Sequence, residues 1–467
     1  MTATTLAPAP AAAGLDALVA VALGALEDGR RLRGGPVPRG TPADVAASVD
    51  LALDGEALPR DGVGEARALQ TLVTAVAAGA ADPADPRCAA HLHCPPLAVA
   101  VAADLVASAL NQSLDSWDQA PAATVLEQRV VAALADLAGM PGGAGVLTTG
   151  GTGSTYTALL LARDAAPTPV RLYASALAHF SVDRAAHLLG LPPVVAVPVD
   201  ADLRMDMMAL AALLRDAPAD ERPVVVATAG TTDTGSIDPL EETGRLVHAV
   251  GGWLHVDAAY GGGVLFSDRH APLLAGLERA DSVSLDLHKL GWQPVAAGIL
   301  LTREPGAFAP LDRRAVYLNP ADDEQVGYTS LLGRSLRTTR RADVLKIAVT
   351  LRALGRRGLG QRVDTCCDLA RVAAARVLAE PALTLARPPV LTTVVFRYLP
   401  ADPARSDEVN AGLRRRLLRE GTAVVGRTEL DGAVHLKLTL LNPDATVADV
   451  EGLLTLVVAA GHAEESA

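Results

Sequence analysis

Aromatic side chains are scarce in this sequence, since Phe, Tyr and Trp together make up only 3% of its 467 residues. Half of the residues are apolar, so a core must be built mainly from small and branched aliphatic side chains. Positive charge is also in deficit, with a formal net charge of −12. A chain of this charge is repelled by polyanions, so we expect neither nucleic acid nor an anionic membrane surface as a partner.

Cysteine is rarer still, and the chain has no C-x-x-C spacing of the kind that binds metals or exchanges disulfides; the four residues are Cys88, Cys94, Cys366 and Cys367. We therefore expect reduced thiols and no metal site. Residues 1–8 lack a basic segment, so we expect no signal peptide. The apolar run 97–110 is interrupted by Asp104 and Ser108 and is too short to span a bilayer. Together these absences predict a cytoplasmic protein.

The length of the chain exceeds what one hydrophobic core usually serves, so several domains are expected. Short β-branched runs alternate with apolar helical segments, and we predict strands at 170–173, 194–199, 223–228, 253–256 and 282–285. Such a pattern is typical of an α/β fold with a mostly parallel sheet covered on both faces. We predict an N-terminal helical segment at 1–90, a large domain at 91–375 with a mobile loop at 311–341, and a smaller C-terminal α+β domain at 376–467.

An aspartate and a lysine each follow one of these predicted strands. Asp257 ends the run His255-Val256-Asp257, and Lys289 follows Asp286-Leu287-His288. Ligands of parallel sheets gather at the carboxyl ends of the strands, where both residues would lie. An amine and a carboxylate are what pyridoxal phosphate requires, the first to bond its aldehyde and the second to keep its ring nitrogen protonated.

Three further segments fit the same cofactor. The Gly/Ser/Thr loop 148–155 opens an apolar helix and would offer N–H groups to a phosphate. His179 could stack on the pyridine ring, and Thr228 begins a hydroxyl-rich turn that could touch it. Small residues after Asp257 would let the ring lie close to the backbone. The predicted cofactor-binding residues are Gly151, Thr152, Gly153, His179, Thr228, Asp257, Ala259, Ser284, His288 and Lys289.

With these motifs in order along 40–460, the chain resembles the group II pyridoxal-phosphate-dependent amino acid decarboxylases. The resemblance is carried by the segments 149–152, 178–182, 255–262 and 286–289. It implies pyridoxal phosphate fold type I, a homodimer with shared active sites, and a carboxy-lyase that releases an amine and carbon dioxide. It also implies that Lys289, Asp257 and His179 are catalytic.

Two segments narrow the resemblance to the bacterial L-2,4-diaminobutyrate and siderophore-type diamino acid decarboxylases. They are 91–96 and 111–124. The substrate candidates within them are His91, His93, Cys94, Asp115 and Asp118. Either aspartate could accept the distal ammonium of a diamino acid, with 2,4-diaminobutyrate expected ahead of lysine or ornithine. Aromatic amino acids and glutamate stay open as alternative substrates.

The long polar segment 311–341 holds the predicted proton donor. In the family, a tyrosine on a mobile loop closes over the neighbouring subunit's site, and Tyr328 is the candidate here, with Tyr317 as the weaker one. Other reactions of the same fold type, such as oxidative decarboxylation and transamination, stay open. A cofactor-free homologue without activity is the alternative of a different class, and the presence of Lys289, Asp257 and His179 argues against it.

Overall fold

The computed structural model describes residues 14–312 and 315–467, so the expectation about residues 1–8 lies outside the described part. Its contacts divide the chain into two compact units. One comprises Met1–Pro95 with Asp368–Ala467, and the other is Pro96–Cys367. The domain boundaries expected near 90 and 375 stay predictions. No helix in the described ranges is long and apolar enough to cross a membrane.

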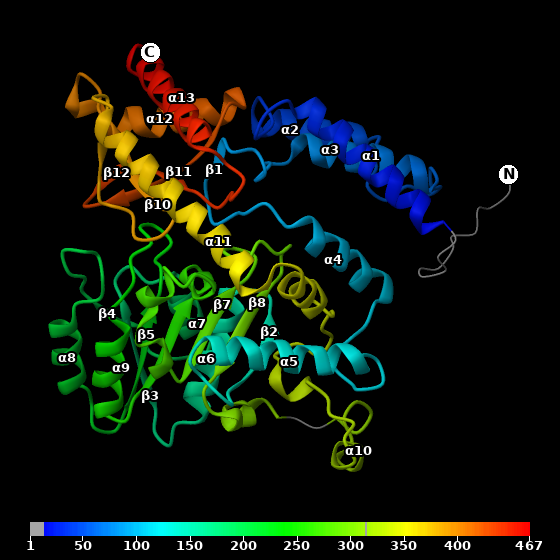
Figure 1. Ribbon diagram of the computed structural model, residues 1–467, viewed down its shortest axis with the longest axis vertical. Helices are drawn as coiled ribbons and strands as arrows, with labels where there is room; N and C mark the ends of the chain where they lie inside the picture. Colours follow the sequence, from blue (N-terminus) through cyan, green and yellow to red (C-terminus); the bar gives the residue numbers. More distant parts are fainter. Residues whose placement is uncertain (1–13, 313–314) are drawn as a thin grey trace. The chain divides into compact units, whose positions relative to one another are not determined.

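A seven-stranded sheet forms the centre of the 96–367 unit (Figure 1). Its spatial order is β2-β8-β7-β6-β5-β3-β4. The strands are β2 (Ala144–Thr148), β3 (Val170–Ser175), β4 (Val195–Val197), β5 (Arg222–Thr228), β6 (Trp253–Ala258), β7 (Ser282–Asp286) and β8 (Gly298–Thr302). The pairs from β4 through β7 are parallel, whereas β8 runs antiparallel to both β7 and β2. This is the mostly parallel α/β sheet that the sequence predicted.

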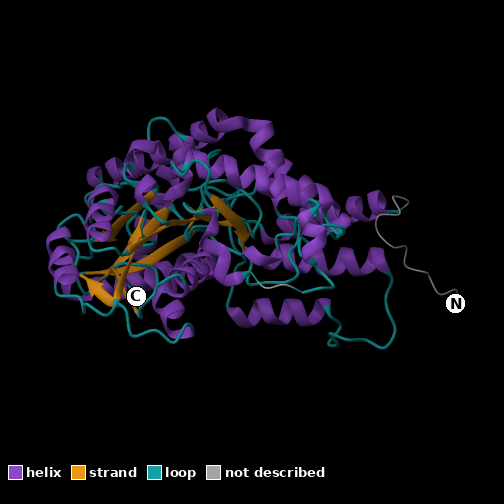
Figure 2. Ribbon diagram, turned by 90° about the horizontal axis from the view of Figure 1, so that it is seen from below, coloured by secondary structure: helices purple, strands orange, loops and turns teal. Residues whose placement is uncertain are grey.

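Helices cover this sheet, and in Figure 2 the orange strands lie between purple helices. Helix α6 packs on β2 and β6 to β8, while α5 packs on β2 and α9 on β5 and β6. The helices of this unit are α4 (Ala98–Leu110), α5 (Pro121–Leu137), α6 (Gly151–Asp164), α7 (Ser181–Leu188), α8 (Met207–Arg215), α9 (Leu240–Ala249) and α10 (Ala321–Gln325). Helix α11 (Val344–Ala379) begins in this unit and ends in the other. Six short 3-10 helices complete the described helical elements: Gly261–Phe266, Ala271–Leu274, Leu277–Arg279, Pro305–Leu311, Leu332–Arg334 and Pro403–Arg405.

Strand positions agree closely with the sequence prediction, because each of the five predicted runs coincides with a parallel strand. Val224, Val225 and Val226 of β5 are fully buried, as a strand covered on both faces requires. The sequence did not predict β2 and β8, which pair antiparallel with each other at one edge of the sheet. Their short runs lack the strong β-branched signal of the central strands.

The second unit contains a five-stranded sheet of order β1-β11-β12-β10-β9. The strands are β1 (Cys88–Ala89), β9 (Leu383–Leu385), β10 (Thr393–Tyr398), β11 (Val424–Leu430) and β12 (Ala433–Thr439). The helices are α1 (Leu15–Arg33), α2 (Pro42–Ala52), α3 (Glu65–Gly79), α12 (Ser406–Glu420) and α13 (Val447–Glu465). Strand β1 pairs in parallel with β11, and Ala89 joins the core cluster that also contains Phe396 and Leu436. Thr41 caps α2 in a capping box with Asp44.

Candidate active site

A cavity of about 270 Å³ opens at the carboxyl ends of β5, β6 and β7. Every residue that lines it belongs to the 96–367 unit. Parallel strands present their ligand groups at this edge, so the site lies where the topology predicts one. The lining residues are Thr149, Gly150, Gly151, Thr152, Gly153, His179, Thr228, Gly230, Thr232, Asp257, Ala259, Tyr260, Asp286, His288 and Lys289.

Lys289 is the amine of the cavity. It sits in the turn that follows β7, and 20% of its side chain is exposed. Its Nζ lies 2.9 Å from Oδ2 of Asp286, the last residue of β7. The ammonium is therefore held at the cavity wall by a buried carboxylate, within reach of a ligand but screened from bulk water.

Asp257, near the end of β6, supplies a carboxylate to the same cavity as Lys289. Its Oδ1 accepts hydrogen bonds from the Ser284 hydroxyl at 3.0 Å and from the Ala259 N–H at 3.1 Å. Both bonds fall on the same oxygen, which leaves Oδ2 for a further donor such as a ring N–H. Ser284 does not line the cavity itself; it orients Asp257 from the neighbouring strand.

His255 lies two residues earlier on the same face of β6 and is fully buried. Its Nδ1 lies 2.9 Å from the Ser282 hydroxyl on β7. Burial lowers the pKa of His255 to about 4, although the Asp257 charge opposes that shift. Because neutral His255 carries no positive charge, it does not form an ion pair with Asp257. The Asp257 carboxylate can therefore pair with a cation in the cavity.

The segment 149–153, called the phosphate loop because it is predicted to hold a phosphate, connects β2 to the first turn of α6. Gly151, Thr152 and Gly153 form the first turn of α6, where backbone N–H groups have no acceptor within the helix. A side chain on Gly151 would place its Cβ 2.8 Å from that of Ala259, and Gly150 has a φ of 142° that disfavours other residues. Glycine therefore keeps space open at the start of α6. The free N–H groups and the positive end of the helix dipole there would favour a bound anion.

The phosphate loop is anchored from behind by a buried ion pair. Arg340 Nη1 lies 2.8 Å from Oε1 of Glu127 on α5, and both side chains are 2% exposed. Glu127 also accepts the Leu147 N–H at 3.2 Å, while Arg340 donates to the Leu147 carbonyl at 3.4 Å. The pair fixes the last part of β2, immediately before the loop.

His179 lines the cavity from the segment that precedes α7. The Ser181 N–H donates to its Nδ1 at 3.3 Å, and the Ser181 hydroxyl lies 2.8 Å from the same nitrogen. Because Nδ1 accepts a backbone proton, the neutral ring carries its own proton on Nε2. Burial lowers the pKa of His179, partly opposed by the charge of Asp257. An uncharged ring of this kind can stack on an aromatic cofactor without repelling a pyridinium.

Thr228 ends β5, and its hydroxyl is buried without a hydrogen-bond partner among the described residues. Its backbone N–H donates to Oδ2 of Asp238 at 2.7 Å, and the Met205 N–H donates to Oδ1 at 2.7 Å. Burial raises the pKa of Asp238 to about 6 despite these two bonds. Asp238 therefore holds the Thr228 turn in place, a role that its position ten residues downstream did not reveal.

The groups that line the cavity fit pyridoxal phosphate. The glycines of the phosphate loop leave room for a phosphate. Oδ2 of Asp257 could accept a ring N–H. The buried Thr228 hydroxyl could bond a polar atom of the ligand. Lys289 supplies the amine. No cluster of metal-ligating side chains occurs in the described ranges. The donor set therefore matches this cofactor.

The predicted substrate residues do not line this cavity. His91, His93 and Cys94 belong to the other unit, where burial is the largest cause that lowers the pKa of both histidines. Asp115 is buried and accepts the Gln119 amide at 2.7 Å, and Asp118 accepts the Ser116 hydroxyl at 2.6 Å. Their contribution to a substrate site stays a prediction.

Tyr328 is 52% exposed and does not line the cavity either. Its ring lies edge-on to Trp117, with 6.3 Å between the centroids. Its role as proton donor likewise stays a prediction. The cavity also contains residues that were not among the predicted site residues: Thr149, Gly150, Gly230, Thr232, Tyr260 and Asp286. Tyr260 and Asp286 lie in two of the segments that carry the resemblance, 255–262 and 286–289.

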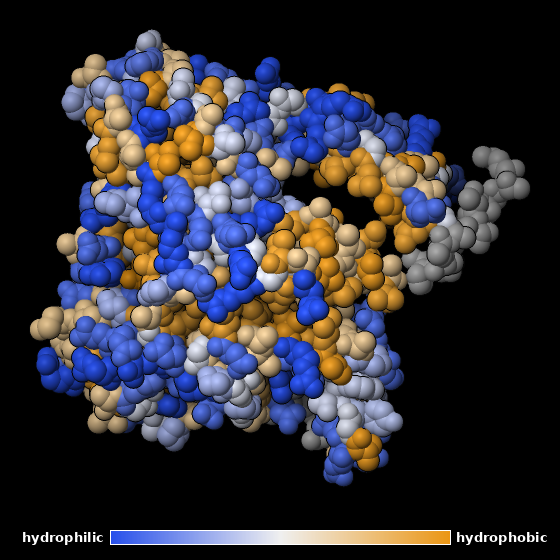
Figure 3. Space-filling model, in the orientation of Figure 1, coloured by the Kyte–Doolittle hydropathy of each residue, from blue (hydrophilic) through white to orange (hydrophobic). Residues whose placement is uncertain are grey.

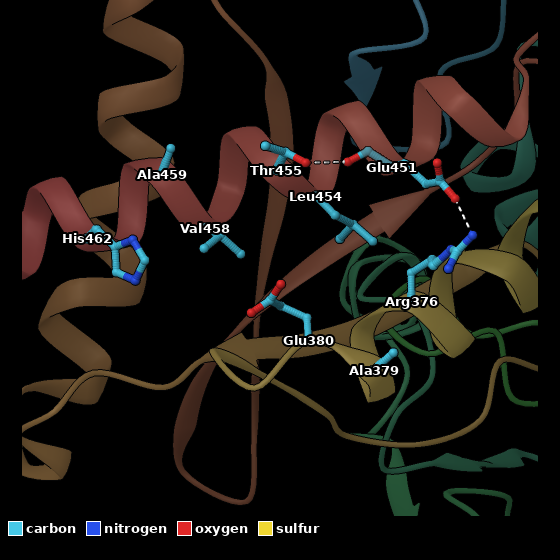
Figure 4. Close-up of a pocket in the computed structure, with 9 residues that line it drawn as sticks. All are labelled: Arg376, Ala379, Glu380, Glu451, Leu454, Thr455, Val458, Ala459 and His462. Atoms are coloured by element: carbon cyan, nitrogen blue, oxygen red, sulfur yellow. Dashed lines mark hydrogen bonds and ion pairs between the residues drawn. The ribbon is translucent and has the colours of Figure 1, made fainter.

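A larger groove of about 610 Å³ lies in the other unit, between α13 and the end of α11 (Figure 4). Three of its charged groups already have partners: Arg376 pairs with Glu451, and Glu380 accepts the Ala382 N–H at 3.2 Å. Alanine, leucine and valine line much of the rest. The groove has no amine and carboxylate arranged for chemistry, so the smaller cavity is the candidate site.

Comparisons with known proteins agree with this site. A model of the pyridoxal-dependent decarboxylase conserved domain matches residues 51–399. L-2,4-diaminobutyrate decarboxylase from Rhizobium meliloti (strain 1021) is 47% identical over 415 residues, which cover 86% of this chain and 83% of that protein. The enzyme of the same name from Acinetobacter baumannii is 34% identical over 431 residues, covering 86% and 84%.

A solved structure resembles this chain over nearly its full length. It is the glutamate decarboxylase domain of diaminobutyrate-pyruvate transaminase and L-2,4-diaminobutyrate decarboxylase from Vibrio parahaemolyticus. The two chains superpose with a TM-score of 0.86 at 31% identity, covering 98% of this chain and 97% of that one. The expected fold type and the expected cofactor are thereby confirmed.

Proposed function

Since the chain belongs to the pyridoxal-dependent decarboxylase family, we propose that it converts L-2,4-diaminobutyrate into 1,3-diaminopropane and carbon dioxide. The family establishes the general reaction: the protein is a carboxy-lyase that acts on an amino acid with pyridoxal phosphate. The observation that carries the specific substrate is the identity of 47% and 34% to two L-2,4-diaminobutyrate decarboxylases over most of both chains.

Each group of the cavity has a part in this proposal. Bound pyridoxal phosphate would accept the electrons left on Cα when carbon dioxide departs. Gly151, Thr152 and Gly153 would hold its phosphate, and His179 would lie against its ring. Asp257 would accept a hydrogen bond from the ring nitrogen through Oδ2. Lys289 would supply the amine for its aldehyde.

The distal ammonium of the substrate pairs with Asp115 or Asp118 in this proposal. Asp115 supports it because its carboxylate is buried, and a buried carboxylate attracts a cation strongly. Both aspartates lie in the segment between α4 and α5, which also holds Leu114 and Ala120. These two apolar residues pack with Leu331, which follows Tyr328 in the long loop.

Tyr328 is the proposed proton donor to Cα, supplied to the neighbouring subunit's site. Its exposed ring, in contact with Trp117, supports a role at a surface that another chain covers. Closing the loop over the site would exclude water from the reacting carbon.

We propose a homodimer in the cytoplasm. Apolar side chains are exposed along α4, including Val101, Leu105 and Val106, and Figure 3 shows hydrophobic surface gathered over this helix. A surface of this kind is typical of an interface. All four cysteines are buried and none of them forms a disulfide, which fits a reducing compartment.

A substrate panel tests the proposal. Purified holoenzyme is incubated with 2,4-diaminobutyrate, ornithine, lysine, glutamate and aromatic amino acids, and carbon dioxide and amine are quantified by mass spectrometry. We expect 1,3-diaminopropane to form with the highest kcat/KM and Lys289→Ala to form none. Preference for another amino acid would overturn the substrate, whereas aldehyde or keto acid as main product would overturn simple decarboxylation.

The role of Asp115 is tested with Asp115→Asn. Losing the charge should raise KM for 2,4-diaminobutyrate by about tenfold or more, because a charge-assisted hydrogen bond contributes roughly 1.5–3 kcal/mol. Asp164→Asn, at the end of α6, is the control and should leave KM unchanged. An unchanged KM in Asp115→Asn and in Asp118→Asn would remove both residues from the substrate site.

A further inference from the structure

Two buried side chains connect the cavity to a surface turn that has no part in the proposed reaction. The turn, 199–205, links β4 to α8 (Figure 1), and a bridge between Val199 and Met205 closes it. Asp202 and Arg204 are exposed, so the turn reaches solvent. Its residues are all described, and none of them lines the cavity.

Asp238 makes the first connection. Its side chain is buried, and each carboxylate oxygen accepts one backbone N–H at 2.7 Å. Oδ1 accepts that of Met205 in the turn, and Oδ2 accepts that of Thr228 at the end of β5. A carboxylate suits both positions because both backbone groups are donors. The end of β5 is therefore tied directly to the surface turn.

Ser236 makes the second connection. Its buried hydroxyl donates to the Leu203 carbonyl in the turn at 2.8 Å. The same hydroxyl lies 2.9 Å from Oγ1 of Thr231, whose N–H donates to the Ser236 carbonyl at 2.9 Å. The residues after β5 therefore form a closed turn of their own, and Ser236 fastens that turn to the 199–205 turn.

The 199–205 turn is fixed from within. Asp200 Oδ1 accepts the N–H groups of Asp202 and Arg204 at 2.8 Å and 3.0 Å. Leu203 has a φ of 60°, a left-handed conformation that a leucine keeps only where its surroundings impose it. Its side chain is buried as well. The turn can therefore serve as a rigid support for the two connections.

The other end of both connections belongs to the cavity wall. Thr228, Gly230 and Thr232 line the cavity, and the Thr228 hydroxyl is buried with no hydrogen-bond partner in the described part of the chain. Thr228 also stands opposite Asp257 in the register of β5 and β6. Its position matters for the reaction, since a displacement of about 1 Å in an active site can lower a rate about 100-fold.

We propose that the surface turn 199–205 is a remote positioning element of the active site, which acts through Asp238 and Ser236 to hold Thr228 in its place in the cavity. Neither connecting residue lines the cavity, so their effect on the reaction is indirect. The proposal rests on the assignment of this cavity as the cofactor site and deepens it. It does not depend on which amino acid is the substrate.

Three variants weaken the arrangement at different places. In Asp238→Asn a side-chain NH2 would face one of the two backbone N–H groups, so one bond is lost. Ser236→Ala removes the second connection and changes the buried interior least. Asp200→Ala loosens the turn itself, and it is the most telling variant because the Asp200 carboxylate bonds only residues of its own turn.

Asp206→Asn is the matched control. Asp206 Oδ1 also accepts two backbone N–H groups, those of Met208 and Ala209, but both belong to α8. This variant should lower Tm because α8 loses an acceptor at its first turn. It should leave the kinetics and the cofactor affinity unchanged.

Each holoenzyme is measured in four ways. They are kcat and KM at saturating pyridoxal phosphate for the best substrate of the panel, Kd for pyridoxal phosphate by absorbance, Tm, and deuterium exchange of the segment 228–232 by mass spectrometry. We expect kcat to fall about tenfold or more in Asp238→Asn and about threefold in Ser236→Ala and Asp200→Ala, with KM within about twofold of wild type. Kd should rise and exchange should quicken in all three.

Three results would overturn the proposal. One is a lower Tm in Asp238→Asn and Ser236→Ala with kcat and Kd unchanged, because the contacts would then serve stability alone. Wild-type kcat in Asp200→Ala is another, since the conformation of the turn would not matter. The third is an equal loss of kcat in Asp206→Asn. If no amino acid of the panel were decarboxylated, the proposed function would fail, while Kd and deuterium exchange would still test the positioning role.

Discussion

At the scale of single residues, the site depends on pairs of side chains on neighbouring strands. The register of β6 and β7 places His255 opposite Ser282 and Asp257 opposite Ser284. Each serine hydroxyl lies within hydrogen-bonding distance of its partner, 2.9 Å and 3.0 Å away. The two serines therefore hold His255 and Asp257 in fixed positions on the same face of β6.

His255 should make the fold sensitive to acid. Its folded pKa of about 4 lies below the ordinary value of 6.5, so the unfolded chain binds the proton more readily between these values. The stability contributed by neutral His255 is fully present above pH 6.5 and is lost as the pH falls toward 4.

The variant His255→Asn removes the titratable imidazole and keeps a polar side chain near Ser282. Between about pH 7 and about pH 5, wild type should lose about 2 kcal/mol more of its free energy of unfolding than the variant. Urea unfolding at the two pH values measures the difference. Equal losses in the two proteins would show that His255 is not the acid-sensitive group.

At the scale of elements, sequence patterns located the central strands because burial on both faces leaves continuous runs such as Val224, Val225 and Val226. They also drew attention to Asp257, which directly follows such a run, and to Lys289, which comes shortly after another. They did not locate β2 and β8, whose antiparallel pairing at the edge places Gly298 beside Thr148. Nor could they show that Asp238 holds Thr228, because that contact depends on a turn that closes in space.

The Glu127–Arg340 pair is the element-scale contact with the clearest consequence. It joins α5, the end of β2 and the segment before α11. Removing one partner leaves a buried charge uncompensated, so Glu127→Ala should reduce the free energy of unfolding by about 3–5 kcal/mol. The double variant Glu127→Met with Arg340→Leu should recover much of this loss.

Urea unfolding measures these changes, and the exposed pair Glu242–Arg245 is the matched control. Those side chains are 50% and 64% exposed, so Glu242→Ala should cost about 0.5 kcal/mol or less. A loss in Glu127→Ala no greater than in Glu242→Ala would contradict the structural role of the buried pair.

At the scale of the whole molecule, the exposed apolar surface of α4 leads us to expect a dimer. The net charge of −12 favours solubility, yet α4 exposes several large apolar side chains. Val106 on that helix is 47% exposed. Burying such a face against a second copy would stabilise a dimer, because apolar area removed from water contributes about 25 cal/mol per Å².

We expect a dimer by sedimentation velocity, and Val106→Glu should shift it toward monomer with loss of activity. Val250, 44% exposed after α9, provides a matched control, and Val250→Glu should leave the mass and the activity unchanged. A wild-type monomer with full activity would refute both the dimer and the shared active site.

The residues of the sequence by themselves pointed to the cofactor, and the resemblance of their motifs to a known family implied the reaction class. Lys289, Asp257, His179 and the glycine loop are recognisable because their chemistry depends on residue type and on their order along consecutive strands. The tertiary structure alone decided which side chains support them: Ser284 on Asp257, Asp238 on Thr228, and Asp286 beside both Lys289 and the phosphate loop. These contacts join positions brought together by strand register and turn closure, and only folding creates such proximity.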